Sequence, residues 1–107
     1  MEDSSLSRII GIIIQTIDPD SIILFGSRAT GNFHAESDYD ICILKTGIKE
    51  RRKTAKLLYR ALYGVGSSVD ILVETPALFE TNKMNPHLIY RDIARFGKIV
   101  YEKSTNC

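Results

Sequence analysis

The chain has few cysteines, no basic leader and no long apolar run, and each of these absences excludes a class of protein. Cys42 lies in an apolar segment and Cys107 is the last residue, so this pair is a poor disulfide framework and indicates free thiols in a reducing cytoplasm. The isoleucine-rich stretch 9–14 is too short to span a bilayer, and the start at Met1 and Glu2 is acidic where a signal peptide would be basic. The sequence therefore predicts a cytoplasmic protein with no membrane segment.

A large charge of one sign is also missing. Fourteen Lys and Arg residues against thirteen Asp and Glu residues give a formal net charge of +1. This balance argues against strong nucleic-acid binding through bulk electrostatics. With 107 residues, 44% hydrophobic and 25% charged, the chain has the composition of an ordinary soluble globule. We expect residues 1–107 to form a single domain, because so short a chain has little room for a second one.

Apolar periodicity and turn residues predict alternating helices and strands. The expected helices are 4–17, 48–64, a short one that opens at Pro76, and 86–96, with one helical turn at 28–31. The expected strands are 21–25, 38–44, 69–73 and 98–102. A short connection favours antiparallel pairing of the first two strands, and a helical crossover favours parallel pairing of the next two. The predicted fold class is α/β (α+β), a small mixed sheet of three to four strands with helices packed mainly on one face.

The most informative motif is a Gly26-Ser27 turn followed, ten residues later, by Asp38 and Asp40. Gly26 lets a phosphate approach the backbone, while the Ser27 hydroxyl and nearby N–H groups can donate hydrogen bonds to it. Arg28 is a planar fork that suits phosphate oxygens. Asp38 and Asp40 are two residues apart on a strand and therefore point to the same face. Each half of the motif alone is commonly just a turn or a solvated strand end, so the prediction depends on their joint spacing.

Asp70, near the start of the third strand, supplies another carboxylate. Parallel pairing of the second and third strands would bring it beside Asp38 and Asp40. Three carboxylates so close together would repel one another, and a bound divalent cation would neutralise this repulsion. Hard oxygen ligands suit two Mg²⁺ ions, or Mn²⁺, which stabilise the attacking and leaving oxygens of a phosphoryl displacement. The sequence therefore predicts a site where a metal-bound nucleoside triphosphate is attacked.

At these residues the chain resembles the minimal nucleotidyltransferases (MNT) of the DNA polymerase beta superfamily. The matching positions are Gly26 and Ser27, Asp38 and Asp40, and Asp70, within a resemblance that runs from about residue 5 to residue 102. The resemblance implies Mg²⁺-dependent transfer of a nucleoside monophosphate from a nucleoside triphosphate to a hydroxyl. It also implies roles for each residue: Asp38, Asp40 and Asp70 as catalytic and metal-binding groups, and Gly26, Ser27 and Arg28 as nucleotide-binding groups.

Single-domain members of this family often pair with a HEPN protein in prokaryotic toxin–antitoxin modules, and some add AMP to a tyrosine of the HEPN ribonuclease. The resemblance therefore implies two partners, ATP or another nucleoside triphosphate and a HEPN-family protein. Two functions stay open, namely AMP transfer to the partner and an antitoxin that acts by occlusion without catalysis; an antibiotic-modifying enzyme is a third alternative. The acceptor, the base preference and any homo-oligomer are also open. The basic side chains within 49–60 are either a solvated helix side or a surface that steers the triphosphate or an acidic partner.

Overall fold

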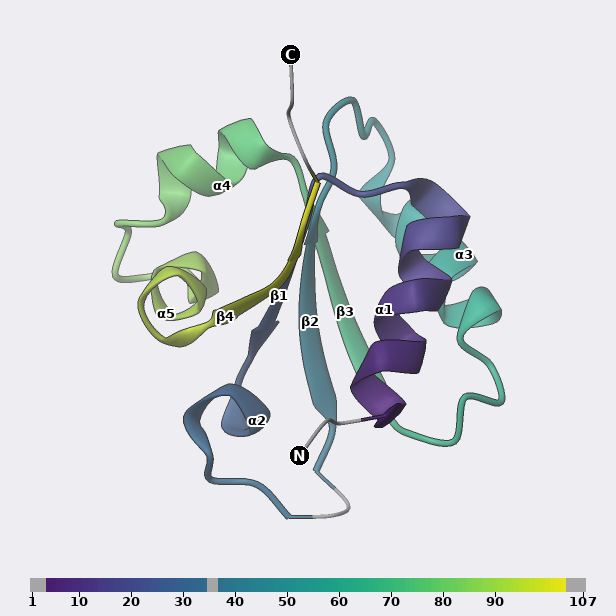
Figure 1. The fold of residues 1–107 in the computed structure, drawn as a ribbon. Coiled ribbons are helices and arrows are strands. Elements are labelled where there is room, and N and C mark those ends of the chain that lie inside the picture. Colours follow the sequence, from purple (N-terminus) through teal and green to yellow (C-terminus); the bar gives the residue numbers. More distant parts are fainter. Residues whose placement is uncertain (1–3, 35–36, 104–107) are drawn as a thin grey trace.

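A computed structural model describes residues 4–34 and 37–103, and Figure 1 shows its fold. The helices are α1 (Ser4–Ile17), α2 (Ser27–Thr30), α3 (Arg51–Ala61), α4 (Pro76–Asn82) and α5 (Ile89–Phe96). The strands are β1 (Ser21–Phe25), β2 (Tyr39–Leu44), β3 (Val69–Glu74) and β4 (Lys98–Glu102). The predicted sequence of helices and strands is therefore confirmed, with small changes in their bounds.

The four strands form one mixed sheet in the order β3-β2-β1-β4. β1 pairs antiparallel with β2, and β2 pairs parallel with β3, as the connection lengths predict. The fourth strand, whose place the sequence left open, pairs antiparallel with the other side of β1. The register sets Phe25 opposite Asp40 and Asp40 opposite Asp70. The end of β1 and the starts of β2 and β3 therefore meet at one end of the sheet, beside α2 in Figure 1.

Helices lie on both faces of the sheet (Figure 1). On one face α1 and α3 cover a core that includes Ile9 and Ile41. On the other face α4 and α5 contribute Phe79 and Ile93, which pack with Cys42. The mixed α/β class is confirmed, while the second face carries two helices and is more covered than the sequence predicted.

Two helices begin later than the sequence predicts, each for a local reason. Before α3, which starts at Arg51, Gly47 adopts a left-handed φ of 83° within a turn. Before α5, which starts at Ile89, the side-chain oxygen of Asn85 accepts a hydrogen bond from the backbone N–H of His87 at 2.9 Å. Such Asx turns compete with helix for the local backbone groups. Residues 85–88 therefore form a turn where the sequence pattern indicates a first helical turn.

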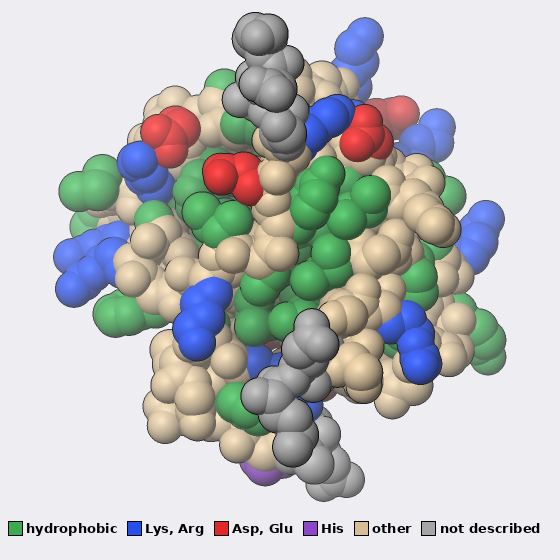
Figure 2. All heavy atoms as spheres, viewed as in Figure 1, with side chains coloured by type: hydrophobic (Ala, Val, Ile, Leu, Met, Phe, Trp, Pro, Cys, Tyr) green, Lys and Arg blue, Asp and Glu red, His purple; other side chains and the backbone are tan. Residues whose placement is uncertain are grey.

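The isoleucines of α1 divide into two groups. Ile9 and Ile13 are fully buried, whereas Ile10, Ile12 and Ile14 are half-buried against the same core. Figure 2 shows hydrophobic side chains gathered in the middle of the face on which β4 and α1 lie nearest the viewer, with Lys and Arg side chains around them. Part of the apolar surface of α1 therefore reaches the molecular surface.

Cys42 is a buried free thiol, as the sequence predicts, and burial raises its pKa to about 12. The other predicted free thiol, Cys107, lies outside the described residues. Within residues 4–34 and 37–103, no helix combines the length and the apolar character needed to cross a bilayer.

Candidate active site

The turn after β1 is built around Gly26. Its backbone has φ 72° and ψ −155°, a conformation essentially reserved for glycine. A Cβ atom at this position would also collide with the carboxylate oxygen Oδ2 of Asp40. Glycine is therefore required here twice, once by the backbone and once by the carboxylate that approaches it.

Ser27 follows directly and opens α2, a single helical turn. The backbone N–H of Ala29 donates to the carbonyl of Gly26 at 3.1 Å, and Gly31 closes the turn by donating to the carbonyl of Ser27 at 3.0 Å. The Thr30 hydroxyl donates to the same Ser27 carbonyl at 3.3 Å. This bracing confirms the predicted helical turn and fixes Ser27 beside the glycine that faces Asp40.

Arg28 is engaged within the protein. Its Nε donates to the carbonyl of Ser37 at 3.0 Å, and its guanidinium lies 3.9 Å from the ring centroid of Tyr39 and 4.9 Å from that of Phe33. Such stacked cation–π contacts are favourable when partly shielded from water. Arg28 therefore ties the loop between the two halves of the motif to the start of β2, and its contact with phosphate stays a prediction.

The three aspartates share one end of the sheet. Asp40, on β2, is half-buried, whereas Asp38, just before the strand, and Asp70, on β3, are exposed. Burial raises the pKa of Asp40 above its usual value, and the negative charges of Asp70 and then of Asp38 raise it further. The structure thus places Asp70 and Asp38 near enough to Asp40 for their charges to act on it. Tyr39, between two of them, is buried in the core as the strand alternation predicts.

The carboxylates fit a divalent cation in their chemistry. Among the described residues, no three His, Cys, Asp or Glu side chains are close enough together, as they stand, to hold a metal ion. The side chains near Asp40 are nevertheless oxygen donors, the charges of Asp70 and Asp38 act against the charge of Asp40, and Gly26 lets this carboxylate approach the turn. Hard oxygen donors of this kind suit Mg²⁺ or Mn²⁺, whose charge would relieve the repulsion. Asp38, Asp40 and Asp70 are the residues that could hold such an ion.

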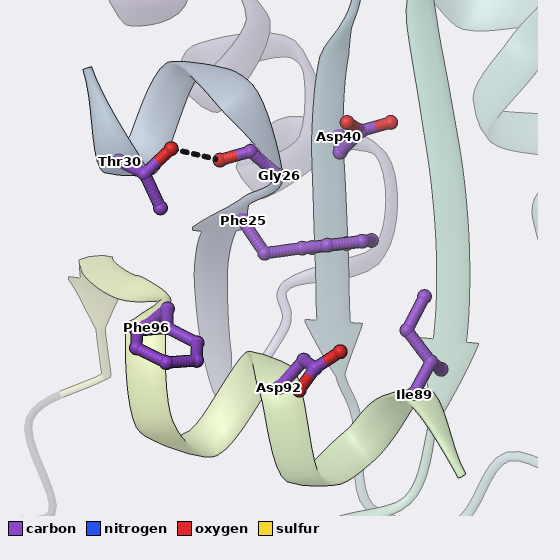
Figure 3. A pocket seen from close by; sticks show the side chains of 7 residues that line it. All are labelled: Phe25, Gly26, Thr30, Asp40, Ile89, Asp92 and Phe96. Atoms are coloured by element: carbon purple, nitrogen blue, oxygen red, sulfur yellow. Dashed lines mark hydrogen bonds between the residues drawn. The ribbon is translucent and has the colours of Figure 1, made fainter. Parts of the chain in front are cut away.

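A pocket of about 470 Å³ adjoins this end of the sheet (Figure 3). Its lining residues are Phe25 and Asp40 from the sheet, Gly26 and Thr30 from the turn and α2, and Ile89, Asp92 and Phe96 from α5. Sequence reasoning missed the three residues of α5, because the place of that helix over the sheet depends on tertiary packing. The only local signal was the apolar stripe that makes Ile93 of the same helix a core residue.

The sequence matches the family model described as polymerase beta, nucleotidyltransferase, over residues 7–106. The chain belongs to this nucleotidyltransferase family. No curated protein matches it by sequence.

Solved structures share the fold at low sequence identity. A crystal structure described as a toxin–antitoxin with AMP-PNP is 22% identical, with a TM-score of 0.64, over 91% of this chain and 73% of its own. A mutant of the toxin–antitoxin MntA-HpeT, with two aspartates two residues apart changed to glutamate, is 20% identical, with a TM-score of 0.63, over 91% of this chain and 73% of its own. A second MntA-HpeT mutant, with one tyrosine changed to alanine, is 20% identical, with a TM-score of 0.64, over 96% of this chain and 75% of its own.

Proposed function

We propose that this protein is an antitoxin that transfers AMP from ATP to a hydroxyl of its toxin, a tyrosine of a HEPN ribonuclease. The observation that carries the proposal is the approach of Asp40 to Gly26, with Asp70 opposite Asp40 on the neighbouring strand. Membership of the nucleotidyltransferase family supports the reaction class. The toxin–antitoxin neighbours, one of them described with AMP-PNP, support the nucleotide and the kind of partner.

The reaction is a displacement at the α-phosphorus of ATP. The acceptor oxygen forms a bond to the α-phosphorus, the bond from that phosphorus to the oxygen bridging to the β-phosphate breaks, and pyrophosphate leaves. Asp70 takes the proton of the acceptor hydroxyl as general base. Asp38 and Asp40 would hold two Mg²⁺ ions and Asp70 one of them, and the ions would supply charge neutralisation at the reacting phosphate and the leaving group. The Ser27 hydroxyl and the backbone around Gly26 bind the triphosphate.

The position of Asp70 favours a macromolecular acceptor. β3 is an edge strand of the sheet, and Asp70 is exposed on it. A hydroxyl carried by another protein can therefore reach this carboxylate from solvent without entering a closed cavity.

The test is transfer of label from α-labelled ATP to the protein encoded beside this chain, with Mg²⁺ present and γ-labelled ATP as the negative control. We expect the partner to be labelled by the wild type and not by Asp40→Asn. Asp18→Asn is the matched control, because Asp18 is exposed, lies just before β1, and makes a surface ion pair with Lys103 that contributes little. Absence of label on the partner with wild-type protein would contradict the proposal.

A second candidate function is neutralisation by occlusion, without catalysis. The half-buried isoleucines Ile10, Ile12 and Ile14 of α1 favour it, because apolar side chains that stay partly exposed commonly bind proteins. The two functions differ in one cellular test, growth of cells that express the toxin together with Asp40→Asn. Loss of protection supports transfer, whereas full protection supports occlusion.

A further inference from the structure

Helix α5 contributes a carboxylate to the pocket that the proposed reaction leaves without a role. Figure 3 shows Asp92 directed from α5 toward the cavity, on the side away from Gly26 and Asp40. None of the family-motif positions includes it. We propose that this pocket binds the sugar and base of the nucleoside triphosphate, and that Asp92 accepts a hydrogen bond from the nucleoside. The inference rests on the proposed function, because it places the nucleotide of the same reaction.

The pocket has the size and the walls that a nucleoside needs. Its volume of about 470 Å³ lies within the roughly 300–1,000 Å³ typical of small-molecule sites. Phe25 supplies one aromatic wall and Phe96 another, and Ile89 adds an aliphatic surface. Phe96 and Ile89 stay 54% and 50% exposed although they are large and apolar. The guanidinium of Arg95 lies over the Phe96 ring, 5.2 Å from its centroid, so a base would stack on the other face of that ring.

The carboxylate of Asp92 suits the nucleoside and not the phosphates. An ionised carboxylate accepts hydrogen bonds and donates none, and it repels phosphate. The triphosphate therefore belongs at the Gly26 side of the pocket (Figure 3). There the Ser27 hydroxyl and backbone N–H groups can donate to it, and the cations that Asp38, Asp40 and Asp70 would hold offset their negative charge. On the α5 side Asp92 requires a donor, which a nucleoside offers as ribose hydroxyls or as the amino group of its base.

Asp92 is also free to accept such a donor. Within the part of the chain that the structure describes, no ion pair or hydrogen bond engages its carboxylate. Because Asp92 is exposed, water can hydrogen-bond its carboxylate in the free protein, and the lack of a protein donor does not destabilise the fold. A ligand donor would therefore form a new bond without breaking an existing one.

The test measures equilibrium binding by calorimetry in the presence of Mg²⁺, with ATP and with inorganic tripolyphosphate. We expect Asp92→Ala to weaken ATP binding roughly ten- to a hundredfold, the effect of one hydrogen bond to a charged group, and to leave tripolyphosphate binding unchanged. Phe96→Ala should likewise weaken ATP binding and spare tripolyphosphate. Glu102→Ala is the matched acidic control, because its β1 partner is Ser21, at the far end of β1 from Phe25.

Two analogues identify the donor. If a ribose hydroxyl donates to Asp92, a deoxy analogue of ATP should bind the wild type about as weakly as ATP binds Asp92→Ala. If the amino group of the base donates, inosine triphosphate, which lacks that group, should bind the wild type about as weakly as ATP binds Asp92→Ala. That analogue should then bind Asp92→Ala no more weakly than ATP does, because the analogue and the mutation remove the same hydrogen bond.

The inference is overturned if Asp92→Ala binds ATP as tightly as the wild type does. It is also overturned if ATP and tripolyphosphate weaken together, because Asp92 would then act on the whole site and not on the nucleoside. Binding is read without transfer, so a wild type that binds ATP through Asp92 but labels no partner contradicts only the proposed function. A wild type that binds no Mg²⁺-ATP contradicts both.

Discussion

The carboxylates at the two ends of the β2–β3 strand pair have opposite surroundings. At one end Leu44 lies opposite Glu74, and at the other Asp40 lies opposite Asp70. Glu74 is only 2% exposed, yet its oxygens accept hydrogen bonds from Arg51 and from the hydroxyl of Tyr90, both at 2.6 Å. Asp40 is less buried and has two carboxylates as its charged neighbours. Burial alone therefore does not identify the functional carboxylate of this sheet.

The pKa shifts express the same contrast. Burial raises the pKa of Glu74, but hydrogen bonds from Tyr90 and from the backbone N–H of Thr75, and the charge of Arg51, outweigh it and lower the pKa overall. Burial and then the hydrogen bond to Glu74 together raise the pKa of Tyr90 to about 12. For Asp40, burial and neighbouring negative charges act in one direction, upward. Glu74, whose oxygens accept hydrogen bonds within the protein, stabilises the fold, whereas Asp40, whose neighbours are negatively charged, is available to bind a cation.

The largest expected effect comes from neutralising Asp40, whose charged neighbours are carboxylates. Asp40→Asn should lower AMP transfer about a thousandfold, or about 4 kcal/mol, because it removes a ligand of the reacting centre. Single-turnover transfer of label from α-labelled ATP measures the effect. A variant that keeps more than a tenth of the wild-type rate would place the chemistry elsewhere.

Gly26→Ala should lower the free energy of unfolding by about 3 kcal/mol, since a Cβ there is strained and meets Asp40. Gly47→Ala is the control, because Gly47 also has positive φ but no atom lies within 4 Å of its added Cβ. Urea unfolding compares the two variants. If the two variants lost the same free energy of unfolding, the close approach of Asp40 to Gly26 would not contribute to the cost of the added Cβ.

Glu74→Gln should lower the free energy of unfolding by about 2 kcal/mol, with a Tm lower by roughly 10 °C, because it weakens the charge-assisted bonds from Arg51 and Tyr90. Arg51 is 56% exposed and recovers part of this loss through water. Mg²⁺-ATP affinity should stay unchanged. If Glu74→Gln weakened nucleotide binding without lowering the Tm, the division between structural and functional carboxylates would fail.

The smallest effect is a pH dependence of opposite sign at the two ends. The pKa of Asp40 in the folded state lies above its usual 3.8, because burial and then the neighbouring carboxylates disfavour its charge. The charged form therefore destabilises the ligand-free protein near neutral pH, and this cost is relieved as pH falls through the folded pKa. The free energy of unfolding of ligand-free Asp40→Asn should therefore be higher than that of the wild type, by under about 1 kcal/mol near pH 7 and by less near pH 4. Glu74 has a folded pKa below its usual 4.5, so its contribution is present above that value and is lost as pH falls through the folded pKa. Urea unfolding of the wild type, Asp40→Asn and Glu74→Gln across this range measures both signs.

Local patterns were sufficient to predict the end of the sheet that carries Asp40. Strand alternation placed Tyr39 in the core and Asp40 on the opposite face, and the connection lengths placed Asp70 on a parallel neighbour. These features depend on residues close in the sequence or on one crossover, which is why a single sequence predicts them.

Long-range side-chain contacts could not be predicted in this way. The ion pair between Arg51 and Glu74 joins residues 23 positions apart, and the Tyr90 bond to the same carboxylate spans 16. Arg28 was predicted to face phosphate, but no local pattern shows that its guanidinium stacks on Tyr39. The place of Asp92 in the pocket likewise depends on how α5 packs over the sheet.

The most direct test of the central claim is the melting temperature with and without millimolar Mg²⁺-ATP, for the wild type, Asp40→Asn, Asp70→Asn and the control Asp18→Asn. If Asp40 and Asp70 bind the metal-bound nucleotide together, the wild type and Asp18→Asn should gain about 2.7 kcal/mol at a hundred times the dissociation constant. The other two variants should gain little. An unchanged melting temperature of the wild type, or an equal gain in all four proteins, would contradict a nucleotide site at these carboxylates.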